Sequence, residues 1–320
     1  MAASVGPSPR RKGVIAVHSL QRFVFSVPDL AAAAGFYSDF GLDVRQTSGR
    51  LDLYTFGHEH RWGSIYQGQG PKKRLEYISF GAYAEDHEPL VRRLQERGFA
   101  RVKPHPLADQ DGVWLADPDG TAVQLVVSAK VSPAEKSVPR VPAAVAVGSG
   151  AAPARSAVTQ VRPRRLSHIL LFSTDVPRSV QFYADALGLR LSDKSGEIIA
   201  FVHGAHASDH HMVAFAKSDG PGLHHSSWDV ASVDEVGLGM QQMMDRGHPD
   251  GWGVGRHVLG SNYFRYIRDP WGSFAEYSFD IDFIPEYLDW PAKDHPAEDS
   301  FYVWGPPVPD YFITNHESKS

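Results

Sequence analysis

The sequence predicts an α+β protein of two domains, in which each domain consists of two βαβββ modules that form an open barrel around a pocket. Three observations support this fold class. The chain has 320 residues, enough for two domains of ordinary size. Residues 129–163 are rich in Ala, Pro, Val, Ser and Gly and contain no aromatic residue, as expected of a linker. The segments on either side of this linker share one pattern, which indicates an internal duplication.

The duplication defines the expected elements in order. The matching segments are 20–42 with 166–189, 75–82 with 223–230, 91–98 with 239–247, and 117–124 with 269–276. The first pair reads as a strand, a turn containing Asp29 or Asp175, and a helix with apolar residues at helical spacing. The second pair reads as a strand, the third as a helix, and the fourth as an Asp-Pro-x-Gly turn between two strands. Strands outnumber helices, which is typical of the α+β class.

Five consecutive parts follow from this pattern. The predicted parts are a disordered tail (1–17), an N-terminal domain without metal (18–128), the linker (129–163), a C-terminal catalytic domain (164–290) and a C-terminal extension (291–320). A linker of this length is unusual in a compact chain, so we expect it to cross a domain face as a strap. We expect the extension to pack on the mouth of the barrel.

The composition excludes several classes of function. The chain contains no cysteine, so it has no disulfide, no thiolate metal site and no cysteine nucleophile, and we expect a cytoplasmic location. The net charge of -5 gives no general electrostatic reason to bind nucleic acid or an anionic membrane. No run of apolar residues approaches the roughly 18 that a membrane span needs.

Three aligned positions differ between the two halves in a coordinated way. The pairs are His168 with Arg22, His225 with Tyr77, and Glu276 with Gln124. All three positions lie on predicted strands, so their side chains can point at one spot in a shared pocket. Two imidazoles and one carboxylate form the facial triad that binds non-haem Fe(II) and leaves three positions open. A single histidine would more often be an ordinary core or surface residue, but three coordinated differences against a built-in duplicate favour a metal site in the second half only.

On these residues the chain resembles the vicinal oxygen chelate superfamily, and within it the type I extradiol catechol dioxygenases. The resemblance covers roughly residues 18–128 and 165–290. Its motifs are Leu-Ser-His168, Leu-His-His225, and Glu276 after Asp-Pro-Trp-Gly-Ser-Phe-Ala. It implies Fe(II), or Mn(II) in some members, held in the C-terminal domain by His168, His225 and Glu276. It also implies homo-oligomers that cleave a small aromatic diol with O2, beside the two hydroxyl groups, in the catabolism of aromatic compounds.

The resemblance also implies catalytic roles for His211, His257 and Tyr266. In the family, the counterpart of His211 lies in the oxygen pocket, and the counterparts of His257 and Tyr266 contact the substrate oxygen. Imidazoles suit proton transfer because their pKa lies near the working pH. Family members commonly carry an acidic residue shortly after the counterpart of His257, but residues 258–262 contain none. The group that orients His257 is therefore left open.

Two points remain open at this stage. Adjacent side chains of a strand point to opposite faces, so only one of His224 and His225 is expected to face the metal, and the repeat favours His225. The alternative functions are another non-haem iron oxygenase on the same scaffold and a metal-free module that binds an aromatic ligand. The ring substituents of the substrate cannot be read from the sequence.

Overall fold

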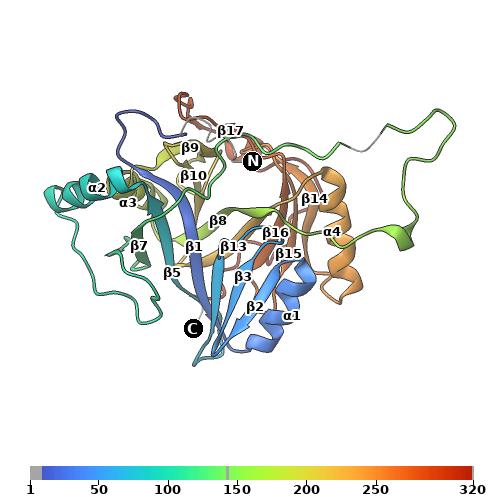
Figure 1. Cartoon of the computed structure of the whole chain (residues 1–320), viewed down its shortest axis with the longest axis horizontal. Helices are drawn as coiled ribbons and strands as arrows, with labels where there is room; N and C mark the ends of the chain where they lie inside the picture. Colours follow the sequence, from blue (N-terminus) through green and yellow to red (C-terminus); the bar gives the residue numbers. More distant parts are fainter. Residues whose placement is uncertain (1–8, 142–143, 319–320) are drawn as a thin grey trace, which may run out of the picture.

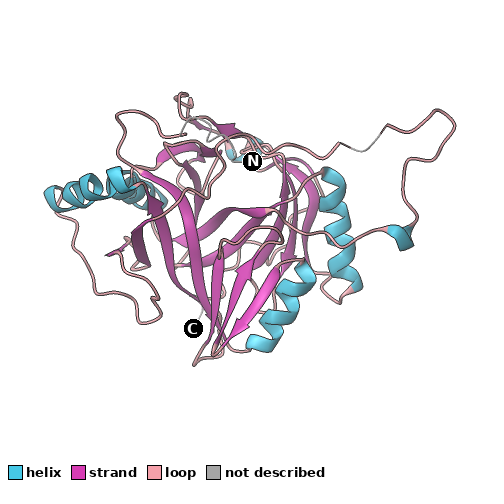
Figure 2. Cartoon of the chain, viewed as in Figure 1, coloured by secondary structure: helices cyan, strands magenta, loops and turns pink. Residues whose placement is uncertain are grey.

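The computed structural model describes residues 9–141 and 144–318, which form two large sheets with helices on their outer faces and one small sheet (Figures 1 and 2). One sheet has 7 strands, one has 10, and a small sheet has 2. Residues 1–8 of the predicted tail lie outside the described residues. Residues 9–16 contain no helix or strand, but Arg10 pairs with the buried Asp86, and the backbone N–H of Arg11 donates to His206 Nδ1.

The first half of the chain forms the sheet of 7 strands. Its elements are β1 (Val17–Val27), α1 (Leu30–Phe40), β2 (Asp43–Thr47), β3 (Arg50–Tyr54), β4 (Gly63–Gln67), β5 (Arg74–Ala82), α2 (Ala84–Glu96), β6 (Val113–Ala116) and β7 (Ala122–Val127). The strand order is β2-β3-β4-β1-β5-β7-β6. In the second module only two strands follow the helix, because residues 99–112, all of them described, form no strand. The expected βαβββ unit is one strand short there.

The second half forms the sheet of 10 strands, in the order β18-β9-β10-β12-β8-β13-β16-β15-β14-β19. Its first module contains β8 (Arg165–Ser173), α3 (Val176–Leu187), β9 (Arg190–Ser195), β10 (Ile199–His203), β11 (Ser208–Asp209) and β12 (Val213–Lys217). Its second module contains β13 (Gly222–Asp229), α4 (Val233–Asp245), β14 (Gly251–His257), β15 (Tyr263–Arg268) and β16 (Phe274–Phe279). The α+β fold with paired modules is thus confirmed.

Helix capping explains why the matched aspartates recur in the two halves. Asp29 accepts a hydrogen bond from the N–H of Ala32 at the start of α1, and Asp175 accepts one from the N–H of Arg178 at the start of α3. Each carboxylate satisfies a backbone donor that the first helical turn leaves free. Both helices end at a glycine in the left-handed conformation, Gly41 and Gly188.

The two halves pair their central strands in the same register. In the first half Arg22 of β1 lies opposite Ser79 of β5, and Ser79 lies opposite Gln124 of β7. In the second half the corresponding set is His168 of β8, Ser227 of β13 and Glu276 of β16. This identical register confirms the alignment of the duplicated halves, and it places the residues at corresponding points of the two pockets.

The two halves share one hydrophobic core. The first helix of each half packs against the second helix of the other: α1 contacts α4, and α2 contacts α3. Next to α1, the rings of Phe40 and Tyr277 stack with centroids 3.9 Å apart, and Tyr277 Oη donates to the carbonyl of Phe40 at 2.7 Å. A cluster of buried apolar side chains runs without a break through both halves. The halves are therefore held together by buried contacts as well as by the linker.

The linker and the C-terminal extension both pack on the second half. The linker contains the short helix η1 (Arg155–Ala157), and the stretch from residue 144 to η1 stands out from the body (Figure 1). Near its start, Lys130 donates to the carbonyl of Ala207, and further on Arg140 pairs with Glu235. The extension and the segment before it add β17 (Phe283–Ile284), β18 (Lys293–Asp294), η2 (Ala297–Asp299) and β19 (Tyr302–Trp304). The strands β18 and β19 extend the large sheet at its two opposite edges.

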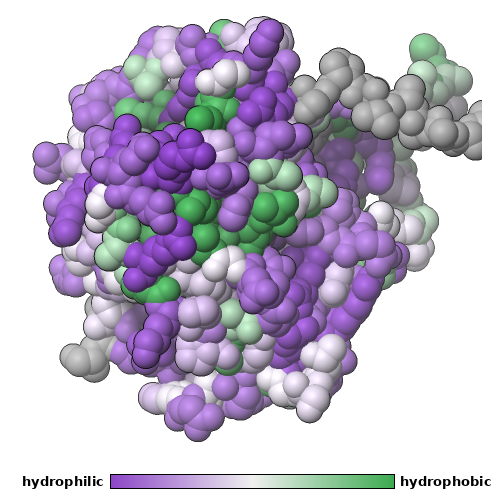
Figure 3. Space-filling view, turned by 60° about the vertical axis from the view of Figure 1, so that its left-hand side comes forward, coloured by the Kyte–Doolittle hydropathy of each residue, from purple (hydrophilic) through white to green (hydrophobic). Residues whose placement is uncertain are grey.

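The surface shown in Figure 3 is mostly hydrophilic, with apolar side chains gathered in a patch near its centre. Within the described part of the chain, no helix combines the length and the apolar character that crossing a membrane requires. The predicted domain boundaries remain a proposal. The first strand of the first half begins at Val17 and that of the second half at Arg165, and the described part of the linker between the halves contains no strand.

Candidate metal centre and its cavity

His168, His225 and Glu276 converge from three neighbouring strands, β8, β13 and β16. Glu276 Oε2 lies 3.3 Å from His168 Nε2 and 3.7 Å from His225 Nε2. All three side chains are buried, with at most 3% of the residue exposed. One ligand atom from each of the three side chains lies within 4.8 Å of the others, so this group can hold a metal ion. The structure brings the three predicted ligands together.

Two of the ligand atoms lack any other partner. Among the described residues, neither His225 Nε2 nor Glu276 Oε2 has a hydrogen-bond partner, although both are buried. Buried polar atoms are normally paired, so atoms without a partner that converge on one point indicate a bound cation. Two ligands at right angles, each about 2.1 Å from an ion, lie about 3 Å apart, close to the separations observed. The residues therefore fit a divalent ion of the type that a facial triad binds.

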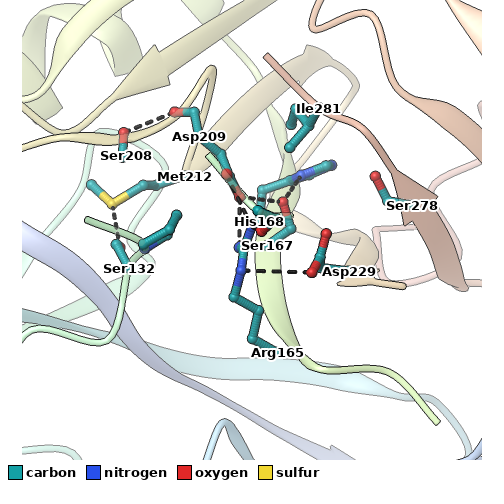
Figure 4. A network of polar contacts seen from close by, with 12 residues as sticks. Ser132, Arg165, Ser167, His168, Ser208, Asp209, Met212, Asp229, Ser278 and Ile281 are labelled. Atoms are coloured by element: carbon teal, nitrogen blue, oxygen red, sulfur yellow. Dashed lines mark hydrogen bonds and ion pairs between the residues drawn. The ribbon is translucent and has the colours of Figure 1, made fainter. Parts of the chain in front are cut away.

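A chain of polar contacts fixes the ring of His168 (Figure 4). His168 Nδ1 lies 3.2 Å from Ser167 Oγ, which donates to Asp209 Oδ2 at 2.8 Å. Arg165 donates to both carboxylate oxygens of Asp209. Because Asp209 can only accept, the serine hydroxyl donates to it and in turn accepts the proton of His168 Nδ1. This order leaves a lone pair on His168 Nε2, directed at the metal site.

The ring of His225 is fixed by its neighbour His224. The two Nδ1 atoms lie 2.7 Å apart, and His224 Nε2 lies 2.7 Å from the carbonyl oxygen of Phe312. That carbonyl can only accept, so His224 carries its proton on Nε2 and accepts a hydrogen bond from His225 Nδ1. His225 Nε2 is then free to bind a metal. A register shift between Leu223 and His225 accompanies this contact, so the two rings touch although they are adjacent in a strand.

Glu276 is held in its charged form. Burial raises the pKa of this carboxyl, but the close approach of His168 and the nearby ring of His257 outweigh burial and lower it. Asn262 Nδ2 donates to Glu276 Oε1 at 3.1 Å and to Ser278 Oγ at 2.9 Å. With Oε1 occupied by the amide, Oε2 is the oxygen that remains for the metal.

His257 and Tyr266 lie together at one side of the site. His257 Nε2 lies 2.9 Å from Tyr266 Oη, and His257 Nδ1 lies 2.9 Å from the carbonyl oxygen of Phe301. The Phe301 carbonyl, which belongs to the C-terminal extension, is the orienting group that the sequence left open. Because it accepts the proton of Nδ1, the lone pair of Nε2 accepts from the Tyr266 hydroxyl. Burial lowers the pKa of His257 and raises that of Tyr266 well above its ordinary value.

His211 lies at another side of the same cavity. Its ring centroid is 4.0 Å from that of His168, and Phe201 packs against it at 4.8 Å. Burial lowers the pKa of His211 well below its ordinary value, and the neighbouring histidines add to this shift. The ring is therefore neutral at pH 7. All six residues predicted from the sequence thus lie around one point.

The cavity in front of the ligands has a volume of about 270 Å³. Its walls are mainly apolar and include Leu170, Phe172, Ile199, Phe201, Leu259 and Phe312. Ile198 and Ile313 also line it and are 62% and 73% exposed, which puts them at its mouth. Ala297, Ser300, Phe301 and Phe312 of the extension contribute to the wall, so the expected packing of the extension on the mouth is confirmed. A larger cavity of about 740 Å³, beside Lys73 and Asp269, contains none of the predicted site residues.

The corresponding pocket of the first half is filled by other interactions. Arg22 pairs with Asp109 at 2.9 Å, and Gln124 donates to the carbonyl of Gln110. The ring of Tyr77 packs with Trp114 in a separate small apolar cluster. These residues offer a cation, an amide and an aromatic ring where the second half offers three ligand groups. The contrast supports the prediction of a metal site in the second half only.

Sequence reasoning missed the groups that support the site from behind. The carbonyls of Phe301 and Phe312 belong to a backbone whose position no residue type reveals, and Asn262 appeared only as part of a segment without an acid. His224 was treated as the residue that faces away, but it contacts His225 directly. Asp209 lies two residues before His211, but nothing in the sequence indicated that its carboxylate would support His168.

The fold and the site define a metal-binding protein built of paired βαβββ modules. A model of the Glyoxalase/Bleomycin resistance protein/Dioxygenase superfamily matches residues 19–125 and 165–277. Metapyrocatechase 2 of Cupriavidus necator is 48% identical over 317 residues, which cover 99% of this chain and 98% of that protein. The chain therefore belongs to this superfamily, as the resemblance implied.

Two further relatives are more distant. The iron-dependent extradiol dioxygenase of Rhodococcus jostii (strain RHA1) is 30% identical over 132 residues, covering 37% of this chain and 42% of that protein. The structure of the Mn(II)-bound glyoxalase from Novosphingobium aromaticivorans aligns with a TM-score of 0.74 and 23% identity, over 95% of this chain and 96% of the other. The latter similarity shows the shared fold.

Proposed function

We propose that this protein is an iron(II)-dependent extradiol dioxygenase, which opens the ring of a catechol beside its two hydroxyl groups and incorporates both atoms of O2. The observation that carries the proposal is the convergence of His168, His225 and Glu276 at the end of an apolar cavity, with two ligand atoms left without partners. The full-length similarity to a metapyrocatechase and the iron-dependent relative support the reaction class and the metal.

Bound Fe(II) would supply a Lewis acid that favours the ionised catechol, and open positions for the catechol oxygens and O2. The protein itself contributes the shape and the proton acceptors of the site. His257 is already fixed by the Phe301 carbonyl, and its Nε2 accepts from Tyr266 in the free protein. A catechol hydroxyl can replace Tyr266 as the donor to His257 Nε2, or accept from the Tyr266 hydroxyl.

We assign His211 to the oxygen side of the cavity. It is neutral, it lies against His168, and it lines the cavity on the side of Phe201. A neutral imidazole can accept a proton at one ring nitrogen while it donates from the other. Ring opening needs protons to be taken from the catechol and returned to the product, so a histidine at this place can hold one of them.

The walls favour a catechol with an apolar ring substituent. About 270 Å³ accommodates one aromatic ring with a small substituent, and the apolar side chains that line the cavity offer no partner for a carboxylate. Lys217 lines the cavity, but its Nζ donates to the carbonyl of Thr174. Lys217 is exposed, so a carboxylated catechol would lose hydration against the apolar walls and gain at most one solvent-screened ion pair.

Anaerobic reconstitution with Fe(II), followed by catechol, 3-methylcatechol and 2,3-dihydroxybiphenyl under air, tests the proposal. We expect a yellow ring-opened product, one O2 consumed per ring, and loss of both signals in His225→Ala. The control is His87→Ala, which removes a histidine of α2 in the first half. Stoichiometric iron without product from any catechol would refute the substrate class. Failure to bind iron would favour a metal-free module for an aromatic ligand.

The expected homo-oligomer and the cytoplasmic location belong to the same proposal. An interface between copies is supported by β19, the outer strand of the large sheet, on which Val303 and Trp304 are 63% and 46% exposed. Edge strands with exposed apolar side chains are usually covered in the assembled protein. Light scattering coupled to size-exclusion chromatography measures the oligomeric state, and a monomer at micromolar concentration would contradict the expectation.

A further inference from the structure

Asp193 and His210 connect the cavity histidine His211 to the C-terminal extension. His210 is completely buried; its Nε2 lies 2.9 Å from Asp193 Oδ2, and its Nδ1 lies 3.0 Å from His211 Nδ1. Neither Asp193 nor His210 lines the cavity. Among the described residues, the ring of His211 forms a hydrogen bond with His210 and with no other residue. His210 therefore determines which nitrogen of His211 carries the proton.

The carboxylate of Asp193 is surrounded by groups that donate. Oδ1 accepts from the backbone N–H of Lys293 at 2.9 Å and lies 3.1 Å from His295 Nε2. Oδ2 accepts from the indole N–H of Trp290 at 3.2 Å as well as contacting His210. A backbone N–H and an indole N–H can only donate, so both oxygens of Asp193 must accept. Burial raises the pKa of Asp193, but the hydrogen bonds with His210 and Lys293 outweigh burial and lower it.

The positions of the protons follow from this carboxylate. His210 Nε2 faces an oxygen that accepts, so in the neutral ring Nε2 carries the single proton and His210 Nδ1 carries a lone pair. The two Nδ1 atoms at 3.0 Å must share one proton, which then belongs to His211 Nδ1. The lone pair of His211 is left on Nε2. The opposite arrangement would place a lone pair of His210 against a carboxylate oxygen.

We propose that Asp193 and His210 are positioning residues, which hold His211 in the tautomer with the proton on Nδ1 and direct the lone pair of Nε2 into the cavity. His211 then meets a cavity ligand as an acceptor of a hydrogen bond or proton, not as a donor. Trp290, at the end of the second domain, and Lys293 and His295 of the extension fix the carboxylate. The identity of the ligand as a catechol rests on the proposed function; the tautomer does not.

The sharpest perturbation is Asp193→Asn combined with Trp290→Phe. An asparagine has one side-chain oxygen. Once the indole N–H is gone, the backbone N–H of Lys293 orients this oxygen toward Lys293, in the place of Asp193 Oδ1. The amide NH2 then faces His210, which must accept at Nε2 and donate from Nδ1. His211 must in turn accept at Nδ1 and carry its proton on Nε2, inside the cavity. The single variant Trp290→Phe keeps the carboxylate and is the matched control.

Nitrogen NMR of the zinc-loaded protein, labelled with 15N in histidine, reads the tautomer directly. Zinc is diamagnetic and binds histidine and carboxylate ligands. The signals of His211 are those that disappear in His211→Gln. We expect a protonated Nδ1 and an unprotonated Nε2 in the wild type and in Trp290→Phe, and the reverse in the double variant. A wild-type protein with the proton on Nε2, or a double variant with unchanged signals, would overturn the proposal.

Turnover by the iron-loaded protein gives a second readout. For the double variant we expect kcat to fall by roughly 10- to 100-fold relative to Trp290→Phe, with iron content unchanged and KM altered by less than about threefold. The conservative Asp193→Glu restores an acceptor and is expected to recover part of kcat.

A loosened extension has to be distinguished from a reversed tautomer. Asp294→Asn weakens the same strand β18, since Asp294 accepts from the N–H of Gly196 at 2.8 Å and pairs with Lys194 at 3.0 Å, but it leaves Asp193 intact. An equal loss of kcat in Asp294→Asn would refute a specific role for Asp193. If the wild type turns over no catechol at all, the proposed function fails, while the NMR result still decides the tautomer.

Discussion

Replacing Ser167 with alanine removes one oxygen atom from the support of the metal ligand His168 (Figure 4). Ser167 Oγ accepts from His168 Nδ1 at 3.2 Å and donates to Asp209 Oδ2 at 2.8 Å. Both Ser167 and His168 are buried, with 7% and 2% of their surfaces exposed, so water does not readily take the place of the hydroxyl. In Ser167→Ala the N–H of His168 is left without an acceptor.

The magnitude follows from the cost of that unsatisfied donor. A buried polar group without a partner costs about 1–3 kcal/mol. This cost falls on the tautomer that binds metal, because only that tautomer carries its proton on Nδ1. A penalty of this size corresponds to a loss of affinity of roughly 5- to 150-fold. Asp209 keeps two hydrogen bonds from Arg165, so we expect the fold to lose less than the metal site does.

Anaerobic titration calorimetry of the metal-free protein with Fe(II) measures this loss, and urea unfolding of the same samples measures stability. The matched control is Ser208→Ala, because Ser208 Oγ accepts from the N–H of Gly204 and donates to the backbone carbonyl of Asp209, whereas the path to His168 uses the Asp209 carboxylate. A dissociation constant for Fe(II) in Ser167→Ala within about twofold of the wild-type value would refute the reasoning. Equal losses in both variants would point to local unfolding instead.

Three further predictions concern stability and specificity. Burial raises the pKa of Asp117 to about 6, so the free energy of unfolding falls by roughly 2–3 kcal/mol as the pH rises from about 4 to 6. Urea unfolding measures this slope, and Asp117→Asn should remove it. An identical slope in both proteins would contradict the assignment. Phe201→Ala enlarges the cavity, and we expect kcat/KM for 2,3-dihydroxybiphenyl relative to catechol to rise by roughly 10-fold; an unchanged ratio would place the substituent elsewhere. Tyr277→Phe leaves the carbonyl of Phe40 without its side-chain donor. We expect the free energy of unfolding in urea to fall by about 1 kcal/mol. No change would mean that this hydrogen bond does not stabilise the fold.

The duplication explains why the metal ligands could be predicted from the sequence. Strands have a side-chain period of two, so equivalent residues of two repeats occupy equivalent places on two sheets. Arg22 lies opposite Ser79 in the first half, as His168 lies opposite Ser227 in the second, so the repeats keep this equivalence. A residue type that changes between repeats then marks a change of chemistry at a known place. The same reasoning predicted the two paired-module halves.

Local rules predicted the helices better than the strands of the second module. Asp29 and Asp175 initiate their helices as expected, because a cap depends on residues three apart in sequence. The missing strand in residues 99–112 has no local cause; whether a segment pairs depends on a neighbour that is distant in sequence. The roles of His211, His257 and Tyr266 remain proposals, although the structure brings all three to the cavity.

The sequence by itself determined the fold class, the duplication and the three ligand positions, because each of these depends on residue types at regular spacing. Only the tertiary structure decided which nitrogen of each histidine faces the metal or the cavity. That choice is made by the carbonyls of Phe301 and Phe312 and by Asp193 and Asp209, which reach the rings from segments distant in sequence. An imidazole presents a donor on one side and an acceptor on the other, so its chemistry is set by whatever group lies behind it.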